Sequence, residues 1–130
     1  MDVHQCVSFI LLNNSRVLLE KRSEFKETDP GLITIPGGHI EHGENQIQAL
    51  FRELDEELNV VPSDYKHLCS LYHPTKELQL IHYFVVNQWE GEVTAQEADS
   101  IAWYSLNTAP VGITADCVAL KEIERVGRYL

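Results

Sequence analysis

Three glutamates within five residues carry the clearest chemical signal in the sequence. Glu53, Glu56 and Glu57 fall within an arc of about 100° when the segment is drawn as an α-helix. Like charges at these spacings repel each other by a few tenths of a kcal/mol on an exposed helix, unless a cation lies among them. Carboxylate oxygens are the ligands that Mg²⁺ and Mn²⁺ prefer. The pattern therefore fits either a divalent-cation site or a solvated acidic face.

A helix can hold these glutamates in fixed positions. Asn45 and Gln48 form a capping-box pattern, and apolar residues then recur every three or four positions, which predicts a helix over residues 46–58. The predicted apolar stripe consists of Ile47, Leu50, Phe51, Leu54 and Leu58. Before the helix, Pro36 must end a short strand predicted at 32–35, and Gly37-Gly38 predict a loop open to backbone contacts.

Strands and a second helix make up the rest of the prediction. The β-rich segments are 3–12, 16–21, 65–71, 79–86 and 101–104, and the first two are joined by a tight turn at Asn13-Asn14-Ser15. A last helix is predicted to begin with Thr114 as its cap, and its buried stripe is Ala119, Ile123, Val126 and Leu130. Strands interrupted and closed by helices predict an α/β or α+β sandwich.

The glycine loop and the acidic helix together resemble the signature of the Nudix hydrolases, G-x5-E-x7-R-E-U-x-E-E-x-G-U with U aliphatic. The stretch reads Gly38-x5-Glu44-x7-Arg52-Glu53-Leu54-x-Glu56-Glu57-x-Asn59-Val60. Asn59 replaces the second glycine, and Asn is the next best residue for a left-handed helix cap. Further similarity to MutT-like members lies in Gly31-Leu32, Trp89-Glu90-Gly91-Glu92, Glu97 and Trp103.

The resemblance implies a fold and a reaction. The fold class is α/β, with an α/β/α sandwich around a mixed β-sheet, in one domain over residues 1–130 whose Nudix box spans 38–60. The implied reaction is hydrolysis, with Mg²⁺ or Mn²⁺, of a nucleoside diphosphate linked to another group. The MutT-like features favour a nucleoside triphosphate, oxidised or unmodified, cleaved to the monophosphate and pyrophosphate. The alternative is a Nudix-fold module that senses a nucleotide without turnover, although the intact box argues against it.

The resemblance also implies roles for the residues of the box. The implied metal ligands are the side chains of Glu53, Glu56 and Glu57 and a backbone carbonyl of Gly37 or Gly38. One of these glutamates, or Glu97, accepts the proton from water. Arg52 is expected to orient a carboxylate through a bidentate contact. Glu44 is either an outer partner of the site or a solvated acid at a helix N-terminus.

Other residues are candidates for substrate contacts. Lys21 and Arg22 follow the second strand and are either phosphate ligands or exposed strand-end charges. Asp116 lies where guanine-reading MutT-like proteins use Asn, so a purine edge is accessible to it but 8-oxoguanine specificity is in doubt. Trp103 and Tyr104 are candidates for stacking on a base, but a strand-borne Trp is more often part of the core.

Three other kinds of site receive little support. His39 and His42 flank Glu41, but a zinc site needs a third ligand at a recognisable spacing, so we expect hydrogen-bonded histidines at the edge of the site. A calcium-binding EF-hand loop requires alternating acids around a glycine, which the sequence lacks. Isopentenyl diphosphate isomerase shares the fold, but it is usually longer and depends on a catalytic cysteine that has no counterpart in a recognisable motif here.

Composition limits the partners. The 130 residues include 10 Lys plus Arg against 20 Asp plus Glu, and the net charge of −10 argues against binding of polymeric nucleic acid. The expected partner is a small nucleotide, bound by a monomer or a homodimer. Cys6, Cys69 and Cys117 are far apart and read as reduced, packed thiols. Because the sequence shows no signal peptide and no membrane-spanning run, a cytoplasmic location is expected.

Overall fold

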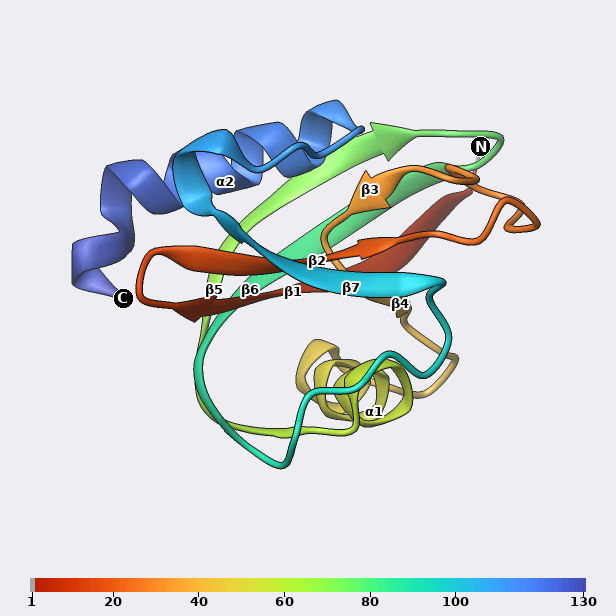
Figure 1. Cartoon of the computed structure of the whole chain (residues 1–130). Coiled ribbons are helices and arrows are strands. Elements are labelled where there is room, and N and C mark those ends of the chain that lie inside the picture. The colour runs from red at the N-terminus through yellow and green to blue at the C-terminus, as the bar shows by residue number, and fades with distance from the viewer. Residues whose placement is uncertain (1) are drawn as a thin grey trace.

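A mixed β-sheet lies between two helices in the computed structural model, which describes residues 2–130 (Figure 1). The strands are β1 (Val3–Asn13), β2 (Arg16–Lys21), β3 (Ile33–Thr34), β4 (Gly37–His39), β5 (Val61–Pro74), β6 (Leu78–Glu90) and β7 (Ser100–Ser105). The helices are α1 (Gln46–Leu58) and α2 (Thr114–Val126), with 3₁₀ turns at Leu106–Thr108 and Gly127–Tyr129. The predicted α/β/α sandwich is confirmed. No helix described over residues 2–130 is long and apolar enough to cross a membrane.

The central strand β1 organises the sheet. The strand order is β3-β2-β1-β6-β5, with β4 added to β1 and β7 added to β2. Strands β1 and β6 run parallel, whereas the other pairings are antiparallel. The β1–β2 hairpin turns at Asn14 and Ser15, whose φ angles of 51° and 62° are those of a type I′ turn. The predicted hairpin is therefore confirmed.

Alternation along β1 divides the core into two clusters. Val7, Phe9 and Leu11 pack with Leu50 of α1, whereas Ile10 packs in the cluster that contains Ala119 of α2. Successive side chains of a strand point to opposite faces of a sheet, so both faces of β1 are apolar and each is covered by one helix. This packing fixes α1 on one side of the sheet and carries its glutamates with it.

Local signals set both ends of α1, which spans the predicted residues. The Asn45 side chain accepts a hydrogen bond from the Gln48 amide (2.8 Å), and the Gln48 side chain accepts one from the Asn45 amide (2.9 Å). At the other end, Asn59 adopts the left-handed conformation (φ 62°, ψ 38°), as expected for the residue that replaces glycine. Of the predicted stripe, Leu50, Leu54 and Leu58 are buried, whereas Ile47 in the first turn is 39% exposed.

We expect Asn45→Ala to lower the free energy of unfolding by about 1 kcal/mol, because it removes the side-chain acceptor of the capping box. Urea unfolding measures this difference. Asn45→Asp keeps an acceptor oxygen and is the control, expected to remain close to the parent protein. Equal stability of the Ala variant and the parent would mean that the cap contributes nothing to the fold.

The glycine segment differs from the prediction. Gly37–His39 form strand β4 and pair with Cys6, Val7 and Ser8 of β1. The backbone contacts expected of a loop are thus made within the sheet. Strand β5 is also longer than predicted and includes Pro62, which is tolerated because β5 lies at the edge of the sheet.

The last helix begins and ends differently from the prediction. Ile113 is the N-cap residue and Thr114 is the first helical residue, without a side-chain cap. Gly112 donates a hydrogen bond to the Ile33 carbonyl (2.8 Å), which ties the chain before the helix to β3. The helix ends at Val126 and is followed by a 3₁₀ turn at Gly127–Tyr129. Leu130, the last residue of the predicted apolar stripe, therefore lies outside the helix.

Candidate active site

Glycine is required where β4 passes between β1 and α1. A Cβ atom on Gly38 would overlap the carboxylate of Glu53 on α1. A Cβ atom on Gly37 would overlap the carbonyl oxygen of Val7 in β1. Gly38 therefore makes room for a side chain of the site, and Gly37 makes room for the backbone of the sheet.

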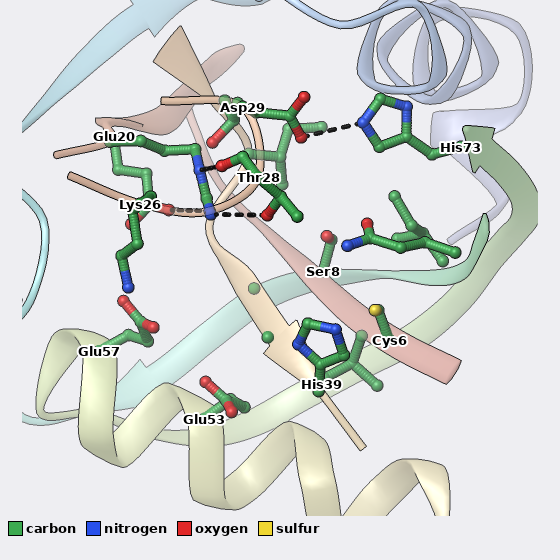
Figure 2. A pocket seen from close by; sticks show the side chains of 18 of the residues that line it. Cys6, Ser8, Glu20, Lys26, Thr28, Asp29, His39, Glu53, Glu57 and His73 are labelled. Atoms are coloured by element: carbon green, nitrogen blue, oxygen red, sulfur yellow. Dashed lines mark hydrogen bonds and ion pairs between the residues drawn. The ribbon is translucent and has the colours of Figure 1, made fainter. Parts of the chain in front are cut away.

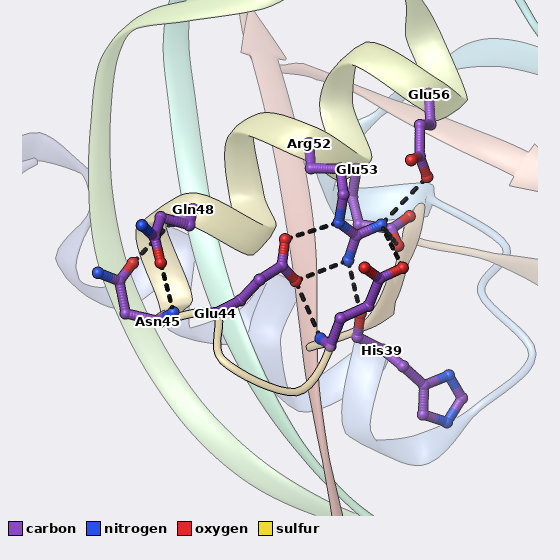
Figure 3. A network of polar contacts seen from close by, with 8 residues as sticks. His39, Glu44, Asn45, Gln48, Arg52, Glu53 and Glu56 are labelled. Atoms are coloured by element: carbon purple, nitrogen blue, oxygen red, sulfur yellow. Dashed lines mark hydrogen bonds and ion pairs between the residues drawn. The ribbon is translucent and has the colours of Figure 1, made fainter.

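Arg52 connects the glutamates of α1 to β4 (Figure 3). Its Nε and Nη2 donate to the two carboxylate oxygens of Glu44, at 2.7 and 2.9 Å, which is the bidentate arrangement. Its Nη1 donates to Glu53 (2.8 Å) and Glu56 (3.1 Å), and its Nη2 also reaches the carbonyl oxygen of His39 (3.0 Å). The Arg52 guanidinium lowers the pKa of Glu44 to about 2. One cation thus orients carboxylates on the helix and at its entry.

The acidic side chains of the site are partly withdrawn from water. Glu53 and Glu57 are 7% and 8% exposed, whereas Glu56 is exposed. Burial raises the pKa of Glu53, and burial together with the charges of Glu20 and Glu97 raises the pKa of Glu57 well above its usual range. Burial also raises the pKa of Glu20 to about 7. Clustered carboxylates that resist ionisation are a suitable oxygen donor set for a hard divalent cation, which would offset their repulsion.

A cavity of about 700 Å³ opens beside these carboxylates (Figure 2). Its lining includes most of the predicted site residues, namely Arg22, Gly37, Gly38, Glu53, Glu56, Glu57, Glu97 and Asp116. The lining described over residues 2–130 does not include Arg52, which lies behind the carboxylates, or Lys21, Trp103 and Tyr104. Trp103 instead stacks on Trp89 with ring centroids 6.0 Å apart, and packs against the α1-side core.

Sequence reasoning missed two further cations, Lys26 and Lys76, which line the cavity. Figure 2 shows Lys26 extending from the loop after β2 toward Glu57. Arg22 is held by Thr28, whose carbonyl and hydroxyl oxygens accept hydrogen bonds at 3.1 and 3.2 Å. Neither lysine belongs to a local pattern, because each reaches the cavity only through the folding of a loop.

Asp116 forms part of the wall on the α2 side. It is 1% exposed, and its two oxygens accept hydrogen bonds from the Ile35 amide (2.9 Å) and the Tyr83 hydroxyl (2.7 Å). Burial raises its pKa to about 6. Nearby in the lining, the hydroxyl of Thr34 is buried and lacks a hydrogen-bond partner among residues 2–130. Two buried polar groups, the Asp116 carboxylate and the Thr34 hydroxyl, therefore belong to the wall of the cavity.

We expect Asp116→Asn to reduce the loss of stability that the protein undergoes as pH rises. The pKa of Asp116 is raised from 3.8 to about 6, so its contribution is fully present below about pH 4 and is lost as pH rises through 6. The loss from this group is on the order of 3 kcal/mol, and the neutral amide avoids it. Urea unfolding at pH 4 and pH 8 measures the difference. The same pH dependence in both proteins would refute this assignment.

The histidines and cysteines differ in their surroundings. His39 hydrogen bonds to Glu77 at the edge of the cavity, as expected, whereas His42 is exposed. Burial raises the pKa of Cys6 to about 12, which keeps its thiol protonated. The prediction of packed thiols is wrong for Cys117, which lies exposed on the outer side of α2.

Comparisons with known proteins find similar sequences and similar structures. The sequence profile of the NUDIX domain matches residues 2–121. The 8-oxo-dGTP diphosphatase of Escherichia coli (strain K12) is 31% identical over 111 residues, covering 85% of this chain and 82% of that protein. The CTP pyrophosphohydrolase of the same organism is 28% identical over 81% of this chain and 78% of that protein. A crystal structure of a MutT NUDIX hydrolase from Burkholderia pseudomallei superposes with a TM-score of 0.85, at 22% identity, over 95% of this chain and 99% of that one.

Proposed function

The chain belongs to the Nudix family, and on this basis we propose that it cleaves a nucleoside triphosphate to the monophosphate and pyrophosphate with the help of Mg²⁺ or Mn²⁺. The observation that carries the proposal is the complete set of α1 glutamates, Glu53, Glu56 and Glu57, at the edge of a cavity large enough for a nucleotide, with Arg52 bonded to the first two. The relatives named for activity on 8-oxo-dGTP and CTP support a nucleoside triphosphate.

The side chains of Glu53, Glu56 and Glu57, with a backbone carbonyl of Gly37 or Gly38, would hold the cation. Their oxygens fit the preference of Mg²⁺ and Mn²⁺, and burial together with repulsion from neighbouring carboxylates raises the pKa values of Glu53 and Glu57, a repulsion that a bound cation would offset. When bound, the cation neutralises phosphate charge and lowers the pKa of water.

The protein's own residues perform the remaining tasks. Arg22, Lys26 and Lys76 line the cavity and bind the negatively charged phosphate chain. Arg52 keeps Glu53 and Glu56 in place, so that these carboxylates need no reorganisation during the reaction. One carboxylate among Glu53, Glu56, Glu57 and Glu97 accepts the proton from the attacking water.

The base of the nucleotide is proposed to lie against Asp116. Each carboxylate oxygen of Asp116 accepts one hydrogen bond from the protein and keeps a second lone pair. Such an acceptor suits a base with an exocyclic amino group, and it differs from the Asn that reads guanine in MutT-like proteins.

A substrate panel tests the proposed function. It includes nucleoside triphosphates, oxidised nucleotides, nucleotide sugars and dinucleoside polyphosphates, each assayed for hydrolysis with Mg²⁺ and with EDTA. We expect the highest kcat/KM with a nucleoside triphosphate whose base bears an exocyclic amino group, and no turnover with EDTA. Preferred hydrolysis of a nucleotide sugar would refute the substrate class, and tight nucleotide binding without turnover would favour the sensor function.

A further inference from the structure

Two histidines and a glutamate form a second group of metal-ligating atoms beside the cavity. Nδ1 of His4, Nε2 of His39 and a carboxylate oxygen of Glu77 all lie within 4.8 Å of one another. The Glu77 carboxylate reaches His4 Nδ1 at 3.0 Å through one oxygen and His39 Nε2 at 2.6 Å through the other. We propose that this group, the His4–His39–Glu77 cluster, binds a divalent transition-metal ion, with Zn²⁺ preferred over Mg²⁺.

The sheet brings these ligands together from three segments. His4 lies in β1, His39 lies in the neighbouring strand β4, and Glu77 immediately precedes β6 on the other side of β1. His39 is paired with Cys6 in the β1–β4 register. Cys6 is two positions after His4 in β1, so the side chains of His4 and His39 lie on the same face of the sheet. Separations of 35 and 38 positions along the chain explain why no sequence motif marks the cluster.

The glutamate is held in place before any ion binds. The Glu77 amide donates to the Thr75 hydroxyl (3.0 Å), and that hydroxyl donates to the Glu77 carbonyl (2.7 Å), which fixes the turn. The side-chain amide of Gln79 donates to one Glu77 carboxylate oxygen (3.1 Å). Hydrogen bonds of this kind orient a ligating carboxylate and increase the affinity of a metal site.

The donor set selects the kind of ion. Two imidazoles and one carboxylate are a recurrent ligand set for zinc, and imidazole favours Zn²⁺, Cu²⁺ and Ni²⁺, whereas Mg²⁺ prefers an all-oxygen site. The rings of His4 and His39 stand at 89° to each other, and both side chains are about half exposed, at 44% and 52%. Solvent access leaves room for a further ligand beside the protein donors.

The cluster is distinct from the glutamates of α1, yet it shares the cavity with them. His39 and Glu77 belong to the cavity lining, and the backbone carbonyl of His39 accepts a hydrogen bond from Arg52 (3.0 Å). A transition-metal ion in the cluster would therefore lie at the rim of the proposed substrate site. Its binding depends on imidazole nitrogens, which the α1 carboxylates lack, so the two sites can be separated by mutation.

Metal titration in excess Mg²⁺ tests the proposal. Zn²⁺ binding is measured by equilibrium dialysis, and Co²⁺ is used as a spectroscopic probe of nitrogen coordination. We expect the parent protein and the control His42→Ala, which removes an exposed histidine three positions after His39, to bind one Zn²⁺. We expect His39→Ala, His4→Ala and Glu77→Gln each to weaken binding by more than the roughly 100-fold that the loss of an outer partner can cost.

Two results would overturn the proposal. One is the absence of Zn²⁺ binding by the parent protein in excess Mg²⁺. The other is binding that survives His4→Ala and His39→Ala but is lost in Glu56→Gln, which would assign the ion to the α1 carboxylates. Circular dichroism of each variant confirms folding, and the exposed positions of His4 and His39 make alanine tolerable at both. The test needs no turnover, so it is independent of the proposed function.

Discussion

Glu56→Gln is expected to lower kcat/KM by a factor on the order of a thousand while leaving the fold intact. The substitution removes a charged oxygen ligand that Arg52 now holds at 3.1 Å, and loss of metal-assisted stabilisation of the transition state is worth several kcal/mol. Glu56 is exposed, so an amide in its place costs little stability. Steady-state kinetics over a range of Mg²⁺ concentrations measure the effect.

Asp55→Asn is the matched control for Glu56→Gln. Asp55 is exposed, lies on the same helix, and projects about 160° away from Glu53 on the helix wheel. The same change of charge at this position should leave kcat/KM nearly unaltered. Equal activity of Glu56→Gln and the parent protein would refute the metal assignment. An equal loss of kcat/KM in Glu56→Gln and Asp55→Asn would mean that the loss comes from the change in net charge and not from a lost metal ligand.

Gly38→Ala is expected to lower kcat/KM about 100-fold with only a small loss of stability. The added methyl group would occupy the space of the Glu53 carboxylate and force it away from Arg52. A displacement of about 1 Å at a reacting centre can cost that much activity. Because the atoms that must move are the end of a flexible side chain, the backbone can remain in place. Kinetics and thermal unfolding of the same preparation measure both effects.

Two other glycines provide the comparison. Gly37→Ala is expected to destabilise the protein strongly, because its methyl group would overlap the backbone of β1, which cannot yield. Gly127 lies in the C-terminal 3₁₀ turn and is not part of the cavity lining. The variant Gly127→Ala should therefore retain activity. Full activity of Gly38→Ala would show that the position of the Glu53 carboxylate is not critical.

Local signals made α1 predictable. The Asn45–Gln48 capping box and the left-handed Asn59 define its ends through contacts within one turn, so neighbouring residues contain the necessary information. The same holds for the turn at Asn14 and Ser15. The role of Arg52 as a holder of carboxylates was expected from the resemblance of its segment to the Nudix signature, although its bond to the carbonyl of His39 was not.

Long-range pairing accounts for what the sequence did not reveal. Strand β4 exists only because β1 lies beside it, and two glycines have no intrinsic preference for a strand. The start of α2 was misplaced by one residue, because the chain before it is positioned by the bond between Gly112 and Ile33, which is distant in the sequence. Lys26, Lys76 and the His4–His39–Glu77 cluster likewise depend on segments that are distant in the sequence.

The most direct test of the account is the identity of the phosphorus products. Phosphorus NMR of a nucleoside triphosphate incubated with the protein and Mg²⁺ should show the monophosphate and pyrophosphate appearing together, and EDTA should abolish both. Production of the diphosphate and orthophosphate, or equal turnover in EDTA, would contradict the proposed metal-dependent pyrophosphohydrolase.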